Sequence, residues 1–159
     1  PLCRENVGID EKEGVEICTH ITETINNLSV FFYNGKDGSV YKKISVRDFE
    51  EGVVYKDAEV KMFFVFCSGI QNGNIHGDGI ALIKDMQVIE FLSYKNTFIG
   101  KDGPCECITS TLIGVEELTT TKNMSVQRIG IGRHKDDFEW CVSVSNFGKI
   151  NNNQHFTRS

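Results

Sequence analysis

The segment from Gly14 to Asn34 constrains the fold most, because it is the one stretch whose large apolar residues recur at helical spacing. These residues step by three and four positions, and they are Ile17, Cys18, Ile21, Ile25, Leu28, Phe31 and Phe32. At about 3.6 residues per turn, such residues lie on one stripe of a helix. A lone amphipathic helix is not stable, and a sheet with one apolar face needs a cover. The segment therefore predicts an N-terminal amphipathic helix that packs on a sheet.

The ends of the chain are expected to be less regular. Asp10 and Glu13 have the spacing of a capping box, which would start the helix near residue 11 and leave residues 1–9 irregular. The polar residues 151–159 are expected to form a tail or an edge strand. A chain of 159 residues with 40% hydrophobic residues fits one domain, so residues 1–159 are predicted to form a single domain.

Most of the chain after the expected helix has strand patterns. Val60 to Cys67 is a continuous apolar run that predicts a buried central strand. Ile80–Ile83 and Val88–Leu92 flank a short polar connection, which predicts a hairpin. Apolar and polar residues alternate in Phe138–Phe147, and Met124–Gly132 precedes it as an antiparallel partner. The predicted class is therefore α+β, with the N-terminal helix packed on a curved, mainly antiparallel sheet.

Charge and hydropathy exclude two kinds of partner. The net charge is -5, and among the scattered basic residues only Lys42 and Lys43 are adjacent, so no nucleic-acid partner is expected. The longest fully apolar run, Met62 to Cys67, is far shorter than the roughly 20 residues that a membrane-spanning helix needs. No integral membrane segment is predicted.

Two features favour a secreted protein. The sequence begins at Pro1 without an initiator Met, which is what removal of a signal peptide, or trimming of the chain, would leave. The tripeptides Asn27-Leu28-Ser29 and Asn123-Met124-Ser125 are sequons, so Asn27 and Asn123 are candidate glycosylation sites. The predicted localisation is secreted, with the signal peptide removed.

The six cysteines leave the disulfide state open. They are Cys3, Cys18, Cys67, Cys105, Cys107 and Cys141. An even count in a secreted protein suggests disulfides, and six positions allow fifteen pairings that the sequence does not rank. Buried free thiols are the alternative, because Cys67 and Cys141 lie in predicted strands, where a thiol packs as a small hydrophobic group.

No constellation for catalysis or for a cofactor emerges. His76 and Asp78 in a glycine-rich loop are the best metal candidates, but this pair lacks the further ligands that a zinc site requires. Phe64, Phe66 and Trp140 are candidate ligand-binding residues if the sheet curves around a cavity, and core packing is the alternative. No catalytic residue, no metal site and no cofactor is predicted, and an enzyme is less favoured than a binding protein.

The order of elements resembles the cone-shaped α+β fold of the nuclear-transport-factor-2-like superfamily. The local similarity is carried by Cys141 to Phe156, Cys-Val-Ser-Val-Ser-Asn-Phe-Gly-Lys-Ile-Asn-Asn-Asn-Gln-His-Phe, which is similar to the last strand pair of that superfamily. The superfamily usually has two or three helices before the sheet, whereas only one is predicted here. Its enzymes place acid-base residues inside the cone, and no matching pair is found, so no catalytic residue is carried over.

A competing resemblance points to the β-sandwich of small pore-forming haemolysins. It rests on Lys84, Gln87-Val88, Ser93-Tyr94 and Phe98-Ile99-Gly100, and a long initial helix fits that fold poorly. The β-sandwich is therefore the alternative fold.

The predicted function is a secreted, non-enzymatic module that binds another protein. Small secreted proteins with such folds resemble effectors that plant-pathogenic fungi deliver into host tissue, so a host-derived protein partner and a role in virulence are expected. One alternative is a carrier or enzyme for a small ligand that uses the concave face of the sheet. A membrane-active toxin is the other alternative.

Overall fold

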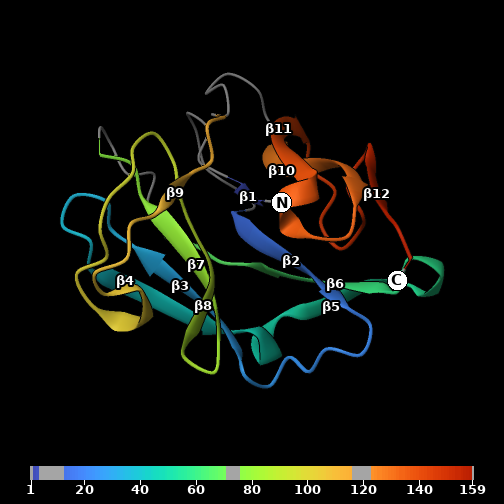
Figure 1. Ribbon diagram of the computed structural model, residues 1–159, viewed down its shortest axis with the longest axis horizontal. Coiled ribbons are helices and arrows are strands. Elements are labelled where there is room, and N and C mark those ends of the chain that lie inside the picture. Colours follow the sequence, from blue (N-terminus) through green and yellow to red (C-terminus); the bar gives the residue numbers. More distant parts are fainter. Residues whose placement is uncertain (1, 4–12, 71–75, 116–122, 159) are drawn as a thin grey trace. The chain divides into compact units, whose positions relative to one another are not determined.

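The computed structural model describes residues 2–3, 13–70, 76–115 and 123–158 (Figure 1). The chain is mainly β, and every helical segment in these residues is a three-residue 3-10 turn. The contacts of the chain divide it into two compact units. Unit 1 consists of Pro1–Glu23, Phe49–Gly69 and Val115–Ser159, and unit 2 consists of Thr24–Asp48 and Ile70–Gly114.

Unit 1 is built on a seven-stranded sheet with the order β11-β10-β1-β2-β6-β5, in which β12 pairs with β10. Its strands are β1 (Leu2–Cys3), β2 (Gly14–His20), β5 (Glu50–Tyr55), β6 (Val60–Phe66), β10 (Met124–Gly132), β11 (Phe138–Val144) and β12 (Gln154–Phe156). All neighbours along this order are antiparallel, whereas β12 runs parallel to β10. The place of β6 between β2 and β5 agrees with the predicted central strand. The strand is not buried along its whole length, however, because Phe64 and Val65 are half-buried and Phe66 is exposed.

Unit 2 is built on a five-stranded sheet with the order β4-β3-β7-β8-β9. Its strands are β3 (Leu28–Tyr33), β4 (Val40–Ser45), β7 (Gly79–Lys84), β8 (Gln87–Ser93) and β9 (Thr111–Leu112). Strands β7 and β8 form the predicted hairpin, and Asp85 and Met86 between them both have positive φ, as a two-residue hairpin turn requires. The core of this unit contains Phe31, Tyr33, Ala81, Ile83, Phe91 and Cys105.

The predicted N-terminal helix is wrong, and so is the cone-shaped α+β class that depends on it. Two strands, β2 and β3, occupy the segment from Gly14 to Asn34, with two turns and a short irregular stretch between them. Val15 and Ile17 of β2 are buried while Cys18 is exposed, a strand-like alternation, and in β3 residues on both faces are buried. The segment is rich in Ile, Val and Thr, whose branched β-carbons favour strands, and this preference outweighs a helical spacing.

This correction also affects the other fold expectations. The β-sandwich alternative likewise implies a mainly β chain, and that much of it agrees with the structure. The small-ligand carrier depends on the concave face of the cone, so it loses that support. The expectation of a single domain stays a prediction. Residues 1 and 4–9 of the expected irregular segment lie outside the described residues, and the 151–159 segment contains β12.

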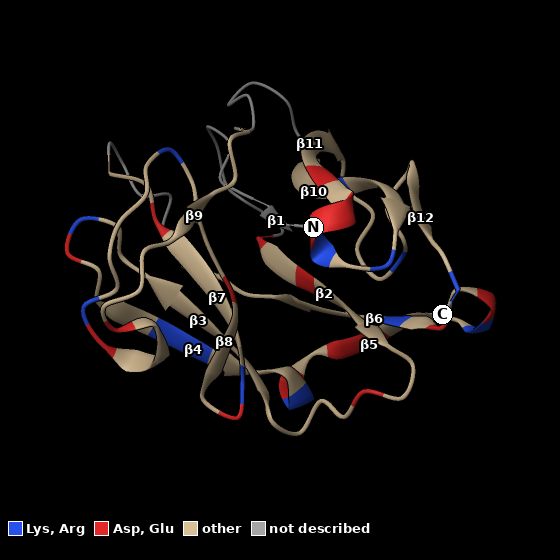
Figure 2. Ribbon diagram, in the orientation of Figure 1, with Lys and Arg blue, Asp and Glu red and all other residues tan. Residues whose placement is uncertain are grey.

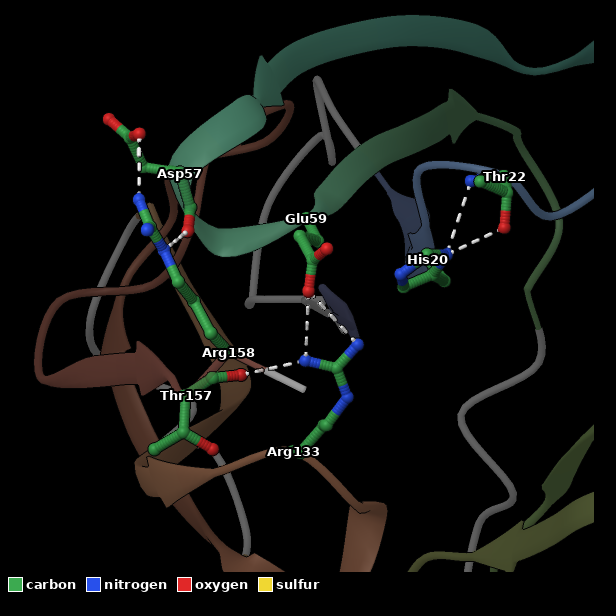
Figure 3. Close-up of polar contacts among 7 residues, drawn as sticks. All are labelled: His20, Thr22, Asp57, Glu59, Arg133, Thr157 and Arg158. Atoms are coloured by element: carbon green, nitrogen blue, oxygen red, sulfur yellow. Dashed lines mark hydrogen bonds and ion pairs between the residues drawn. The ribbon is translucent and has the colours of Figure 1, made fainter.

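Arginine side chains attach the C-terminal segment to a turn of unit 1 (Figure 3). The Arg133 guanidinium donates to Glu59 Oε2 at 3.3 Å and to the Thr157 carbonyl at 2.9 Å. Arg158 donates to the Asp57 carbonyl at 2.9 Å and to its carboxylate at 3.0 Å. Since Asp57 lies in the 3-10 turn η2 (Lys56–Ala58) that precedes β6, these contacts connect the end of the chain to the turn between β5 and β6.

Candidate functional site

Three phenylalanines of unit 1 form a cluster that reaches the surface, here called the aromatic patch: Phe64, Phe66 and Phe147. The Phe66 ring centroid lies 5.6 Å from that of Phe64 and 4.9 Å from that of Phe147, both in edge-on geometry. Phe64 and Phe147 are half-buried, whereas 41% of Phe66 is exposed. An exposed aromatic ring that two others hold in place is a rigid apolar feature on the surface.

The aromatic patch is assembled from two distant parts of the sequence. Phe64 and Phe66 are two residues apart in β6, so their side chains share one face of the sheet. Phe147 follows β11 and is held by the next residue, Gly148, whose carbonyl accepts from the Val53 N–H of β5 at 2.7 Å. Gly148 has φ +80°, and a β-carbon there would approach the Phe64 ring to 3.1 Å. The positive φ therefore favours glycine at this turn, and a side chain there would also press against the Phe64 ring.

A buried carboxylate supports the turn that carries Phe147. Glu16 lies opposite Phe64 in the pairing of β2 with β6, and its Oε2 accepts a hydrogen bond from the Gly148 N–H. Burial raises the pKa of Glu16 above its ordinary value, and the hydrogen bond from Gly148 partly opposes this shift. The side chain thus fixes the backbone beside the aromatic patch.

The structure brings together two of the three predicted ligand-binding residues and separates the third. Trp140 lies in β11, and strands β10, β1 and β2 stand between β11 and β6 in the sheet order. There the Arg128 guanidinium carbon lies 4.5 Å from the centroid of the Trp140 ring, a cation–π contact between cross-strand neighbours. Sequence reasoning missed Phe147 and Glu16. The two-residue spacing of Phe64 and Phe66 signals a shared face, but nothing local in the sequence connects Phe147 to them.

The two predicted metal candidates, His76 and Asp78, differ in burial. Asp78 is buried, and its Oδ1 accepts a hydrogen bond from the Gly35 N–H at 2.8 Å, so this carboxylate holds a turn of unit 2. His76 is exposed. In the part of the chain that the structure describes, no group of three or more His, Cys, Asp or Glu residues could hold a metal ion.

The remaining predicted sites are the six cysteines and the sequon residues Asn27 and Asn123. Cys18, Cys67, Cys105, Cys107 and Cys141 are free thiols, and Cys3 is not described beyond its place in β1. Burial raises the pKa of Cys105 and of Cys141, which lowers the thiolate fraction of each. Asn123 is exposed, while the Asn27 amide donates to the Asp85 carboxylate at 2.6 Å. Glycosylation at these two sites stays a prediction.

No model of a protein family, no curated protein and no solved structure matches this chain. The resemblances drawn from the sequence therefore gain no support, and no superfamily is assigned. Within the described ranges, none of the helical segments is long and apolar enough to cross a lipid bilayer.

Proposed function

We propose that this chain is a non-enzymatic module that binds another protein through the aromatic patch. The adjacency of three phenylalanine rings, with 41% of Phe66 exposed, carries the proposal, because contiguous apolar residues on a surface mark interaction sites more often than single ones do. Phenylalanine is enriched in the contact regions of protein interfaces, and a few such anchors supply most of the binding energy.

The surroundings of Phe66 favour binding with a small entropic cost. Phe64 and Phe147 restrict the ring on two sides, and the Glu16 hydrogen bond to Gly148 fixes the turn below it. A ring that is already ordered loses little freedom when a partner covers it. We therefore expect the partner to present an apolar side chain or a shallow apolar groove to Phe66.

The cellular context belongs to the same proposal. Secretion, which the sequons at Asn27 and Asn123 favour, and a host-derived partner are parts of this proposal. An effector that blocks a host protein would need a rigid contact surface and no catalytic group. The aromatic patch supplies the first requirement.

A peptide library displayed on phage tests the binding surface directly, because it samples many candidate partner sequences at once. Peptides selected on the full chain should share an apolar anchor, and Phe66→Ala should weaken their binding at least about 10-fold. The matched control is Ile131→Ala, since Ile131 is a 69% exposed apolar residue of the same unit, on β10. Selected peptides that bind the Phe66→Ala variant as well as the wild type would contradict the proposal, as would a selection that yields no binding sequence.

A further inference from the structure

Strand β11 is an edge strand. The hydrogen bonds of the neighbouring strand β10 show which backbone groups of β11 point outward. The Gly130 N–H donates to the Asn153 carbonyl and the Gly132 carbonyl accepts from the Thr157 N–H, so these β10 residues face β12. Backbone groups alternate in direction along a strand, so Gln127 and Ile129 of β10 face β11.

The pairing register then decides which residues of β11 face outward. Gln127 lies opposite Cys141 and Ile129 lies opposite Glu139, so these two β11 residues face β10. The bond from the Ser145 N–H to the Asn123 carbonyl continues the same alternation. The backbone groups of Trp140 and Val142 consequently point away from the sheet, and among the described strands β11 has only β10 as a partner.

The other sheet edges carry features that discourage pairing with a further strand. Figure 2 shows basic residues on β4, where Lys42 and Lys43 lie, and acidic residues on β5, where Glu50 and Glu51 lie. Strand β5 also has an irregular register, and its Val53 N–H is bonded to the Gly148 carbonyl. Strand β9 is only two residues long. Charges, bulges, covering loops and short length all protect an edge.

Among the described residues, strand β11 lacks these protections. Its seven residues, Phe-Glu-Trp-Cys-Val-Ser-Val, contain no Lys, Arg or Pro and a single charge, at Glu139. Val144 at its end is 60% exposed. A long edge of this composition is a template for another strand.

We propose that the strand that pairs with β11 is β11 of a second copy of this chain, in a two-fold symmetric antiparallel dimer centred on Cys141. This centre is the one that overlaps all seven residues of the strand with their counterparts. It places Trp140 opposite Val142 of the second copy, and since both face outward, each such pair exchanges two N–H···O bonds. The proposal does not depend on the aromatic patch, which lies beyond β10, β1 and β2 in the sheet order.

The side chains are self-complementary in this register. Trp140 meets Val142 and Phe138 meets Val144, and pairs of an aromatic with a β-branched residue stabilise antiparallel strands. Glu139 meets Ser143, so no like charges oppose each other. The same patch on both copies forms the interface, as two-fold symmetry requires.

Two variants of similar bulk test the register by charge. Ser143→Glu would place a second carboxylate opposite Glu139 of the other copy, and Ser143→Lys would place an ammonium there. We expect sedimentation equilibrium to show a dimer of the full wild-type chain, with a dissociation constant about 10-fold higher for Ser143→Glu than for Ser143→Lys. The gap should narrow at high salt, since these side chains lie near solvent.

Disulfide crosslinking of the wild-type chain gives a second readout that places no new charge in the interface. Opposed residues of a non-hydrogen-bonded pair have Cα atoms about 4.5 Å apart, which is within the range of a disulfide. Diamide should therefore convert the two Cys141 thiols into one S–S bond while it accepts their two protons and two electrons. The covalent dimer should disappear in Cys141→Ser and persist in the control Cys107→Ser, because Cys107 is an exposed thiol of unit 2.

Three results would overturn the proposal. The first is a monomer mass at every concentration up to about 1 mM, where even a weak dimer would form. The second is a dimer that the Ser143→Glu and Ser143→Lys variants form equally well. The third is a covalent dimer that survives in Cys141→Ser, which would place another part of the chain at the interface.

Discussion

Each unit contains a cluster of three aromatic rings, but one cluster is core and the other is surface. In unit 2 the ring centroid of Phe91 lies 4.9 Å from that of Tyr33 and 5.4 Å from that of Phe98. Tyr33 and Phe91 are buried there, at 0% and 4% exposure. The spacing within the aromatic patch of unit 1 is similar, yet 41% of Phe66 is exposed.

The comparison distinguishes aromatic rings that stabilise the fold from aromatic rings that are open to a partner. Rings at similar distances make similar contacts with one another, so the difference lies in what covers them. The core cluster is closed by its own unit, and its loss should be felt in stability. Because the patch is open, its loss should be felt mainly in binding.

The largest expected effect comes from truncating one ring in each cluster. Phe91→Ala should lower the free energy of unfolding by about 3–5 kcal/mol, because it removes buried contacts and leaves a cavity. Phe66→Ala should lower it by only about 1–2 kcal/mol, since 41% of the residue is already exposed to water. Urea denaturation of both variants measures the two values. Similar losses of unfolding free energy in both variants would mean that the two clusters contribute equally to stability, which would contradict this prediction.

A medium effect is expected when the core cluster loses its one hydroxyl. The Tyr33 hydroxyl accepts from the Cys105 N–H at 3.1 Å and donates to the Asp102 carbonyl at 3.3 Å. Tyr33→Phe would leave that buried N–H without its acceptor and should cost about 1–3 kcal/mol. Hydrogen exchange should show reduced protection of the Cys105 amide.

The control for this substitution is Tyr55→Phe in unit 1. The Tyr55 hydroxyl accepts from the Ile150 N–H at the longer distance of 3.3 Å, and the side chain is only half-buried. Its removal should cost less than the removal of the Tyr33 hydroxyl. An equal or larger cost for Tyr55→Phe would show that burial does not set the value of these bonds.

The smallest effect is expected from a change of pH acting on the carboxylate beside the patch. The pKa of Glu16 is raised above 4.5 by burial, so the folded chain binds its proton more tightly than the unfolded chain does. Stability should therefore fall as pH rises from 4.5 through the folded pKa, by about 1.4 kcal/mol for each unit of the shift, and then level off. Glu16→Gln keeps an oxygen acceptor for Gly148 and removes this pH dependence.

Subtracting the free energy of unfolding of Glu16→Gln from that of the wild type at each pH isolates the contribution of Glu16. The other carboxylates contribute equally to both proteins, so their contributions cancel. The wild type should lose stability relative to Glu16→Gln across that pH range. A difference that stays constant from about pH 4 to about pH 8 would show that Glu16 is not the group that burial affects.

The sequence predicts the elements whose signal is local. The apolar run from Val60 to Cys67 is short and continuous, and the hairpin of β7 and β8 has a connection that fits only a tight turn. The error in the segment from Gly14 to Asn34 has a definite cause. Two strands of alternating or fully buried residues, joined by a turn, can place apolar residues three and four positions apart by coincidence.

The patch and the edge could be predicted only in part. The spacing of Phe64 and Phe66 fixes their common face, but Phe147 joins them through a turn that Glu16 and Val53 hold from other strands. Likewise, the sequence of β11 is that of a strand, while its edge position follows from the order of the whole sheet. Pairings between distant segments decide both features, and periodicity along the chain contains no information about them.

The interleaving of the two units has a consequence for synthesis of the chain on the ribosome. Every residue of unit 2 has been translated once Gly114 is made, so this unit can fold while the rest is still being added. The sheet of unit 1 waits longer, because β10 stands between β11 and β1 and comes from the final third of the sequence. Until then β1 pairs with β2 on one side and lacks its β10 neighbour on the other, and this is the stage at which a chaperone would have most to protect.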